Sequence, residues 1–296
     1  IRLRHDGGGR GRVNYRLRNG NANVAMSRVE VFFGVGALLM PFAGAALISS
    51  GHWVAAFVVV GVTAAITMLL WFFMWPTILD RPVETALSGE ARSTGGTGRR
   101  SRMIVVLAAC SLFFAVYVGF EMSVVHYLPS LLVHHNGLSD STASLSLSAF
   151  WGAMVIGRMV SGHAADRWGG GAYMLVTCVS AAVLFILMGG LESVWATFIL
   201  TFLAGLAMSG MFAVALVFAN RAVPGMTERT TSLLMASGGI GGALLPKLTG
   251  WFLDVNGTGA TRWLFAGLAV VMLAVMVWAY VSAKSYQKVR DVGVPA

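Results

Sequence analysis

The strongest constraint on how this chain can fold is a long uncharged run near its start. From Val31 to Leu79 the sequence contains no Asp, Glu, Lys or Arg. A helix needs about 20 apolar residues to cross the hydrocarbon core of a bilayer, so this run is long enough for two crossings. Over the whole chain 11% of residues are charged and 57% are hydrophobic, whereas soluble domains have roughly 25% charged residues. This composition excludes a soluble enzyme, a disulfide-rich secreted scaffold and a disordered chain, and it predicts a protein embedded in a membrane.

Charge-poor runs of spanning length recur along the chain and predict an all-α membrane protein with eight transmembrane helices. The expected spans lie near residues 30–49, 53–75, 103–128, 142–163, 172–191, 194–219, 230–252 and 262–283. A polar, glycine-rich and basic stretch separates the first two spans from the other six. The predicted organisation is therefore a basic cytoplasmic segment 1–29 expected to be poorly ordered, two helices in 30–76, a cytoplasmic linker 77–102, six helices in 103–284 and a cytoplasmic tail 285–296.

The basic residues of the chain are distributed unequally between the two sides of the predicted membrane. The net charge of +9 would suggest a nucleic-acid partner in a soluble protein, but here the basic residues lie in the gaps between spans. With the N-terminal segment inside, the outside loops contain only Arg262, whereas the inside loops contain Arg81, Arg92, Arg99, Arg100, Arg102, Arg158, Arg167, Arg221, Arg229, Lys284, Lys288 and Arg290. The positive-inside rule then predicts a multi-pass protein of the plasma (inner) membrane with both termini in the cytoplasm, and no nucleic acid as partner.

The first and seventh predicted spans resemble each other at an offset of 205 residues. Gly34, Gly36 and Pro41 align with Gly239, Gly241 and Pro246. One interpretation is chance, since small residues and proline are common in membrane helices. The other is a duplicated six-helix unit, which would make the eight spans equivalent to helices 5 to 12 of twelve.

Four stretches of the sequence resemble a known transporter family. Phe32 to Pro41, Tyr117 to Glu121 and Gly205 to Phe212 look like its fifth, seventh and tenth helices, and its cytoplasmic loop motif is matched by Gly162, Asp166, Arg167 and Gly169, preceded by Gly157 and Arg158. The chain thus resembles the major facilitator superfamily, and within it the fucose-permease-like sugar transporters. The resemblance implies a major-facilitator-type helical bundle and proton-coupled movement of a sugar or similar small polar solute by alternating access.

Under this resemblance the first four helices of the family are missing, and they are a possible partner of the chain. Two alternatives stay open. One is a drug or metabolite exporter of the same fold, and the other is a transport-inactive remnant that acts as a receptor. An enzyme is not expected, because no nucleophile and base are arranged for catalysis, and no metal or cofactor site is expected either.

Glu121 is the candidate proton site. It is the only carboxylate expected deep inside a span of the six-helix part, where hydrocarbon favours its protonated form. It could exchange a proton or accept a hydrogen bond from a sugar hydroxyl, or it could be paired to a neighbour purely for folding. Tyr117 lies four residues earlier and therefore shares its helix face.

Three further residues are candidates for the substrate and proton site. Lys247 is expected at a similar depth to Glu121, where it could pair with the carboxylate or extend toward the outer surface. Trp151 and Phe212 could stack on the apolar face of a sugar ring, although most membrane aromatics pack in the core or meet lipid.

The loop motif is expected to act as a gate on the cytoplasmic side. Its glycines Gly157, Gly162 and Gly169 allow a tight turn and close helix approach. Asp166 is expected within about 6 Å of the start of the first span or of an arginine, where it would hold the inner mouth shut. Arg158 and Arg167 complete the predicted gate.

Overall fold

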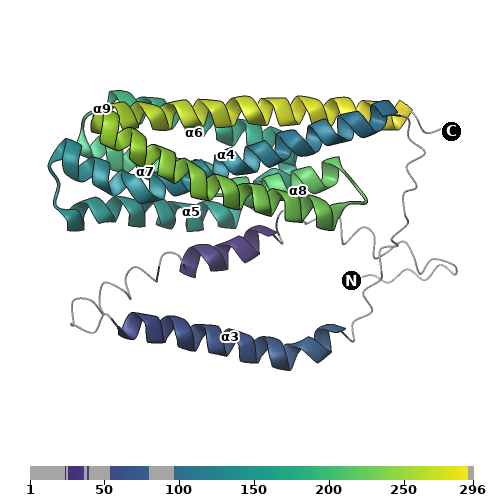
Figure 1. Cartoon of the computed structure of the whole chain (residues 1–296), viewed down its shortest axis with the longest axis horizontal. Helices are drawn as coiled ribbons and strands as arrows, with labels where there is room; N and C mark the ends of the chain where they lie inside the picture. The colour runs from purple at the N-terminus through teal and green to yellow at the C-terminus, as the bar shows by residue number, and fades with distance from the viewer. Residues whose placement is uncertain (1–23, 25, 37–38, 40–53, 80–96, 293–296) are drawn as a thin grey trace. The chain divides into compact units, whose positions relative to one another are not determined.

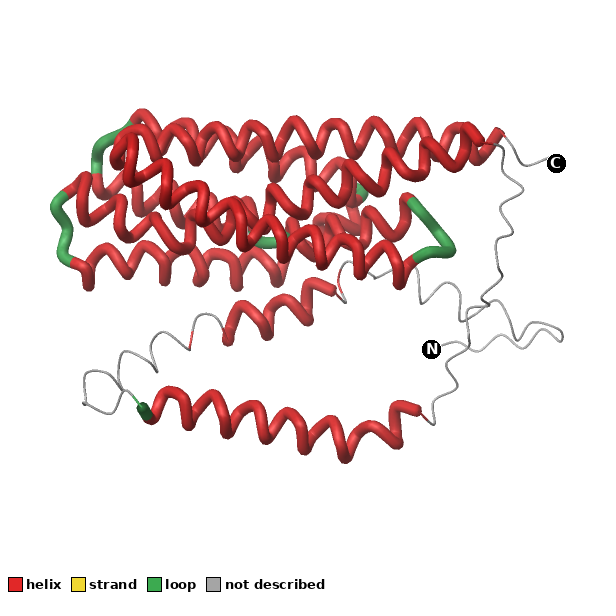
Figure 2. Tube along the Cα trace, viewed as in Figure 1, coloured by secondary structure: helices red, strands yellow, loops and turns green. Residues whose placement is uncertain are grey.

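The structure is a computed structural model that describes residues 24, 26–36, 39, 54–79 and 97–292. These described residues form helices and short turns, with no strand among them (Figure 1, Figure 2). The numbered helices are α3 (Ala55–Leu79), α4 (Thr97–Asn136), α5 (Asp140–Trp168), α6 (Gly170–Gly190), α7 (Val194–Met208), α8 (Met211–Ala222) and α9 (Thr227–Val292). The expectation of an all-α fold is confirmed for this part of the chain.

The chain divides into two compact units. One contains residues 97–292 together with the helical residues 26–34, and the other covers Val35–Gly96 and includes α3. Within its own unit, α3 is one continuous helix, and its segment Phe57–Met74 is long and apolar enough to cross a membrane. The expected boundaries in the basic segment and in most of the linker lie outside the described residues.

Helices α7, α8 and α9 do not correspond one to one with the predicted spans. Residue Gly257 interrupts α9 with a φ of 78°, so this element is two helices joined at a sharp turn. In contrast, α7 and α8 follow one another within a single apolar stretch, Val194–Ala222, that is long enough for one crossing. Counted this way, the described residues contain seven of the eight predicted spans, and of the first span, 30–49, only residues 30–36 and 39 are described.

The six-helix part is held together by close contact between α4 and the first half of α9, which lie side by side in Figure 1. A Cβ atom added at Gly241 would clash with the backbone of Ala115, and one added at Gly119 would meet the backbone of Gly241. Further along, the Thr249 hydroxyl donates to the Ser123 hydroxyl at 3.1 Å. Small residues at a helix interface let two backbones approach, which increases van der Waals contact where no hydrophobic effect operates.

Aromatic rings fill the centre of this part. The Phe120 ring lies edge-on to Phe185 at 4.7 Å and to Phe265 at 6.1 Å, which links α4, α6 and the second half of α9. All three rings are buried. Edge-to-face pairs at these distances add to the stability that burial of the rings already provides.

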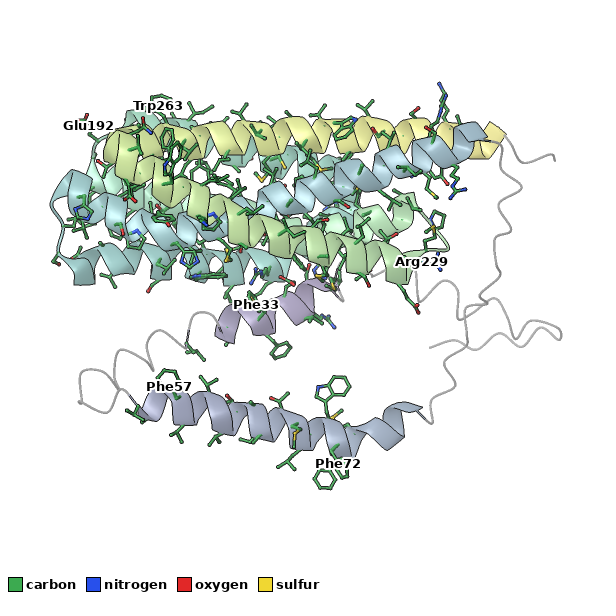
Figure 3. All side chains as sticks on the ribbon, in the orientation of Figure 1. Phe33, Phe57, Phe72, Glu192, Arg229 and Trp263 are labelled. Atoms are coloured by element: carbon green, nitrogen blue, oxygen red, sulfur yellow. The ribbon has the colours of Figure 1, made fainter. Side chains whose placement is uncertain are left out.

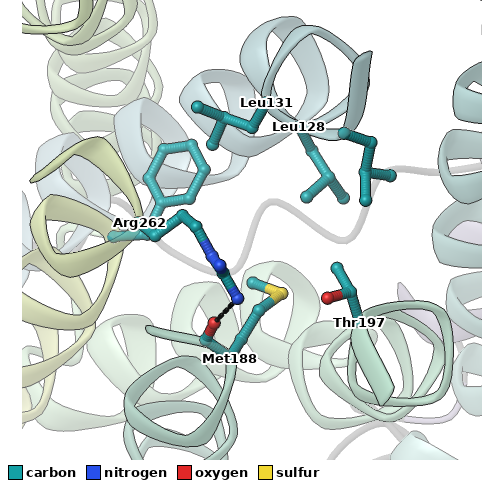
Figure 4. A pocket seen from close by; sticks show the side chains of 7 residues that line it. Leu128, Leu131, Met188, Thr197 and Arg262 are labelled. Carbon is teal, nitrogen blue, oxygen red and sulfur yellow. Dashed lines mark hydrogen bonds between the residues drawn. The ribbon is translucent and has the colours of Figure 1, made fainter. Parts of the chain in front are cut away.

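Arg262 closes one end of α6 (Figure 4). Its guanidinium donates to the carbonyl oxygens of Met188 and Leu191, at the C-terminus of that helix. The last carbonyls of a helix have no partner within it, and a positive charge interacts favourably with that end of the helix dipole. This contact gives Arg262 a structural role at the end of the bundle predicted to face outward. The adjacent cavity of about 10 Å³ is large enough for one water molecule at most.

Candidate functional site

The candidate site is built around a break in the span formed by α7 and α8. The helix ends at Met208, turns through Ser209 and Gly210, and resumes at Met211. At 1.5 Å per residue, the 15 residues of α7 place this break about 22 Å from one end of the span, and the 12 residues of α8 place it about 18 Å from the other. The break is therefore near the middle of this apolar span.

Close packing explains why the break forms at this point. A Cβ atom at Gly210 would clash with the Ser161 side chain and the Tyr173 hydroxyl, and a Cβ at Gly157 would clash with the Ser209 side chain. The missing side chains let α5 approach the turn. A helix that stops inside a bilayer leaves carbonyl oxygens without intrahelical partners, and these must be satisfied by neighbouring groups.

Tyr117 and Arg158 satisfy the two carbonyls at the break. The Tyr117 hydroxyl, on α4, donates to the Met208 carbonyl at 3.5 Å. The Arg158 Nε, on α5, donates to the Ser209 carbonyl at 3.2 Å. Both side chains are buried. The carbonyls at the break are therefore hydrogen-bonded by two buried polar groups, one from α4 and one from α5.

Glu121 lies beside this arrangement, as its place one turn after Tyr117 predicts. Its side chain is 5% exposed, and its carboxyl group is close enough to the Tyr117 hydroxyl for the two to interact. The single Tyr117 O–H donates to the Met208 carbonyl. It can therefore serve the Glu121 carboxyl group only by giving up that bond, or by accepting a hydrogen bond from the protonated acid.

Arg158 connects the break to the first span. It forms an ion pair with Glu30 at 3.4 Å and also donates to the Glu30 backbone carbonyl at 3.2 Å. The Arg158 guanidinium lies 5.5 Å from the centre of the Phe33 ring, which favours a cation above its face. A Cβ atom at Gly34 would meet the Arg158 side chain, so this glycine gives the arginine its space.

These contacts define a polar cluster made of Glu121, Tyr117, Arg158, Glu30 and the carbonyls of Met208 and Ser209. Glu121 lies within electrostatic range of both Arg158 and Glu30. The cluster therefore contains one permanent cation and two carboxyl groups in a buried setting. Because hydrocarbon penalises net charge, one ionised carboxylate beside the arginine costs less free energy than two.

The structure does not bring Lys247 to Glu121, so the first of the two alternatives for Lys247, a pair with the carboxylate, is wrong. Gly241, Leu245 and Thr249 form the face of α9 that contacts α4. Lys247 lies two residues from Leu245 and from Thr249, which is about 200° around the helix, so it points away from α4. Its side chain is exposed, which fits the alternative that it extends toward a membrane surface.

The two aromatic candidates flank the polar cluster on different helices. Trp151 lies two turns before Arg158 on α5 and is 7% exposed, with the Phe33 ring edge-on at 6.2 Å. The labelled Phe33 is on the short helix of residues 26–36 (Figure 3). Phe212 follows the break on α8 and packs edge-on against Phe114 at 5.4 Å. The structure contains no ligand, and stacking on a sugar stays a prediction.

The loop-motif residues separate into two groups. Gly162, Asp166, Arg167 and Gly169 lie at the end of α5 and its turn into α6, where Gly169 adopts a φ of 88°. Asp166 is close to an arginine, as expected, because its Oδ1 is 3.9 Å from Arg221 NH2. Arg167 is exposed. Their role as a gate stays a prediction.

Arg158 does not lie in a cytoplasmic loop, where the distribution of basic residues places it; together with Gly157 it lies inside the predicted span 142–163. Arg158 lies ten residues before the end of α5, which is about 15 Å into the span. It is 2% exposed and is bound to Glu30 and Ser209. The correction has a physical basis, since a buried arginine is tolerated in a bilayer when a carboxylate and carbonyl oxygens surround it.

Sequence reasoning did not identify Glu30, Met208 or Ser209 as site residues. Glu30 immediately precedes the uncharged run and lies at the start of the first predicted span. The sequence did contain one signal: Glu30 and Arg158 are opposite charges that both lie within predicted spans, so each needs a partner. The carbonyls of Met208 and Ser209 have no side-chain signal, because only the break makes them available.

Comparison with known proteins gives one family and several relatives. The family profile described as Major Facilitator Superfamily matches residues 110–294. The glucose/mannose transporter GlcP of Bacillus subtilis is 28% identical over 85% of this chain and 63% of its own length. The fosmidomycin resistance protein of Escherichia coli is 26% identical over 79% of this chain and 58% of its own length. The chain thus spans about three-fifths of the curated relatives it matches.

The fold also matches a solved transporter structure. A structure of the Escherichia coli fucose:proton symporter FucP superposes with a TM-score of 0.69 and 16% sequence identity, and the match covers 88% of this chain and 72% of that one. At this identity the match concerns the arrangement of helices alone.

Proposed function

The chain belongs to the major facilitator superfamily, and from this premise we propose that it is a secondary transporter, or the larger part of one. It moves a sugar or similar small polar solute together with a proton by alternating access. The similarity to GlcP, a glucose/mannose transporter, and to FucP, a fucose:proton symporter, supports this substrate class and coupling. The expected setting is the plasma membrane, with both termini in the cytoplasm.

The observation that carries the proposal is the polar cluster at the broken span. Glu121 is the proton-binding residue, and Tyr117 is its hydrogen-bond partner. Loss of the Glu121 proton leaves two carboxylates for one arginine and weakens the Tyr117 hydrogen bond to the Met208 carbonyl. Proton release is thereby linked to the conformation of the break, which is what coupling between a proton and a moving helix requires.

Trp151 and Phe212 are the proposed stacking residues for the solute. They lie on α5 and α8, on either side of the break in sequence order. Gly162, Asp166, Arg167 and Gly169 form the proposed inner gate, with the Asp166–Arg221 pair as its ionic contact. The pair is partly exposed and of modest strength, which suits a contact that must open in each cycle.

The test is uptake of radiolabelled glucose into proteoliposomes containing the purified chain, with an inside-alkaline pH gradient. We expect accumulation that a protonophore abolishes. Glu121→Gln keeps the shape and hydrogen bonding of the side chain but cannot release a proton. It is expected to lose gradient-driven accumulation and to retain exchange of solute at equal concentration. Glu228→Gln, at an exposed position in the first turn of α9, is the matched control.

Three outcomes would contradict the proposal. Accumulation at the native level by Glu121→Gln would assign Glu121 a purely structural role. The match to the fosmidomycin resistance protein makes an exporter the second candidate function. A native chain that accumulates no sugar, but that shows counterflow driven by fosmidomycin, would favour this alternative. Solute binding without any transport would favour a receptor.

A further inference from the structure

A second polar site lies away from the cluster, at the end of the bundle that the positive-inside rule assigns to the cytoplasm. It is a cavity of about 290 Å³, which we call the basic pocket. Its lining comes from the turn between α5 and α6, the end of α8 and the last part of α9, and includes Trp168, Gly170, Arg221, Tyr280, Lys284 and Gln287. The volume is at the lower end of the range for small-molecule sites and is sufficient for a compact headgroup.

The charges of the basic pocket favour an anion. Arg221 and Lys284 are the charged residues among those that line it, and no carboxylate lines it. Arg221 also contacts Asp166 at 3.9 Å, and the Lys284 ammonium lies 4.7 Å from the centre of the Tyr280 ring. Arg221 is a permanent cation, and the Lys284 ammonium has three N–H donors beside a ring face, so both residues favour an anion and Lys284 can donate to it.

Three consecutive glycines keep one wall of the basic pocket open. Gly169, Gly170 and Gly171 lie where α6 begins, and that helix start has no acidic residue in its first turn and no side-chain cap. A Cβ at Gly170 would lie 3.5 Å from Val214, an ordinary contact distance. A side chain could therefore be accommodated at Gly170, and its absence leaves this wall of the pocket open. The backbone N–H groups of this first turn add to the positive potential set up by Arg221 and Lys284.

The position of the basic pocket indicates the source of the anion. Trp168 is 60% exposed beside it, and Tyr280 lines it. Trp and Tyr concentrate where a span meets the headgroup region, and basic pockets between helices at the cytoplasmic face bind anionic lipid headgroups. We propose that the basic pocket binds the phosphate of an anionic phospholipid from the inner leaflet, with Lys284 and Arg221 as its ligands.

The experiment measures binding of short-chain phosphatidylglycerol to the detergent-solubilised full chain by native mass spectrometry. Phosphatidylcholine of the same chain length and inorganic phosphate are the comparison probes. We expect phosphatidylglycerol to bind more tightly than phosphatidylcholine, and excess inorganic phosphate not to displace it. Lys284→Gln should weaken binding about five-fold, the effect of one basic residue near a membrane surface. Lys288→Gln is the matched control, since this exposed lysine is one turn further and does not line the pocket.

A second variant tests the cavity without changing charge. Gly170→Leu places a side chain in the pocket at a position whose backbone accepts any residue, and it should weaken phosphatidylglycerol binding at least as much as Lys284→Gln. Equal affinity for phosphatidylcholine would overturn charge recognition. Displacement by inorganic phosphate would assign the site to a soluble phosphate instead of lipid. An equal loss of phosphatidylglycerol affinity in Lys288→Gln would mean that binding depends on the general surface charge and not on the pocket, which would overturn the proposed site.

Discussion

Arg158 shows how one buried residue can hold several parts of the molecule together. It binds the Glu30 carboxylate, the Glu30 backbone and the Ser209 carbonyl, and it faces the Phe33 ring. A buried ion pair contributes little net stability compared with apolar packing, but removal of one partner leaves the other charge without compensation. The two members of the pair should therefore be strongly coupled energetically.

A double-mutant cycle tests this coupling. Arg158→Met should reduce the free energy of unfolding by about 3 kcal/mol, because Glu30 is left without its counter-ion. The double variant Arg158→Met with Glu30→Gln should lose at least about 1 kcal/mol less than the sum of the two single variants. Reversible chemical unfolding in detergent micelles measures these values. Arg229→Met, at an exposed position, should change stability by less than about 0.5 kcal/mol. Additive single variants would show that the pair carries no coupling.

At this same scale, the sequence predicted part of the site. Glu121 and Tyr117 could be found because an isolated carboxylate inside an apolar run is costly and therefore informative. Lys247 is likewise an isolated charged residue inside an apolar run, yet it lies on the side of its helix that faces away from α4. Depth along a helix follows from counting residues, whereas the facing direction depends on which neighbour packs against it. A single sequence does not supply that neighbour.

Among the elements, the spans were predictable and their interruptions were not. The run from Val194 to Ala219 carries no charge, so it predicts one continuous helix, and the structure breaks it at Ser209 and Gly210. Glycines are frequent in membrane helices that remain straight, so Gly210 alone is a weak signal. The break depends on what the neighbouring helix places opposite it, here Ser161 and Tyr173.

The contact between α4 and α9 allows a prediction at the element scale, with a control only two residues away. Gly241→Ala should destabilise the protein by about 1–3 kcal/mol, because the new Cβ would clash with the Ala115 backbone, which cannot move aside as a flexible side chain could. Gly239→Ala should be neutral or stabilise by up to about 1 kcal/mol, since nothing lies within 4 Å of its added Cβ and alanine favours a helix. Unfolding measurements that give both variants the same sign and size would contradict this interface.

For the whole molecule, composition was sufficient to predict a membrane protein, and the family resemblance was sufficient to predict the arrangement of its helices. The uncharged runs predicted a membrane bundle, and the loop motif and helix stretches pointed to the superfamily that the family profile identifies. Orientation is a separate property, because the same bundle could be inserted either way. The described helices place Glu192 and Trp263 at one end and Arg229 at the opposite end (Figure 3). The distribution of basic residues predicts that the Arg229 end faces the cytoplasm.

Cysteine labelling tests this orientation directly. Asn256→Cys lies beside the turn within α9, and Glu228→Cys lies at the start of that helix, so the two thiols are at opposite ends of one span. Asn256 is preferable to Gly257, whose φ of 78° disfavours a residue with a Cβ. The native Cys110 and Cys178 are buried and should not react with a membrane-impermeant maleimide.

In intact cells with an opened outer envelope, Asn256→Cys should label, and Glu228→Cys should label only after the membrane is permeabilised. The expectation follows from the cost of moving the basic residues near Glu228 across the bilayer during insertion, which holds that end of the helix inside. Labelling of the unmodified chain sets the background, and labelling in detergent shows that both new thiols are reactive. Reversal of the two patterns would place the basic pocket at the outer leaflet. Labelling of both from one side would mean that the first half of α9 does not cross the membrane, and the span assignment from Gly225 onward would have to be redrawn.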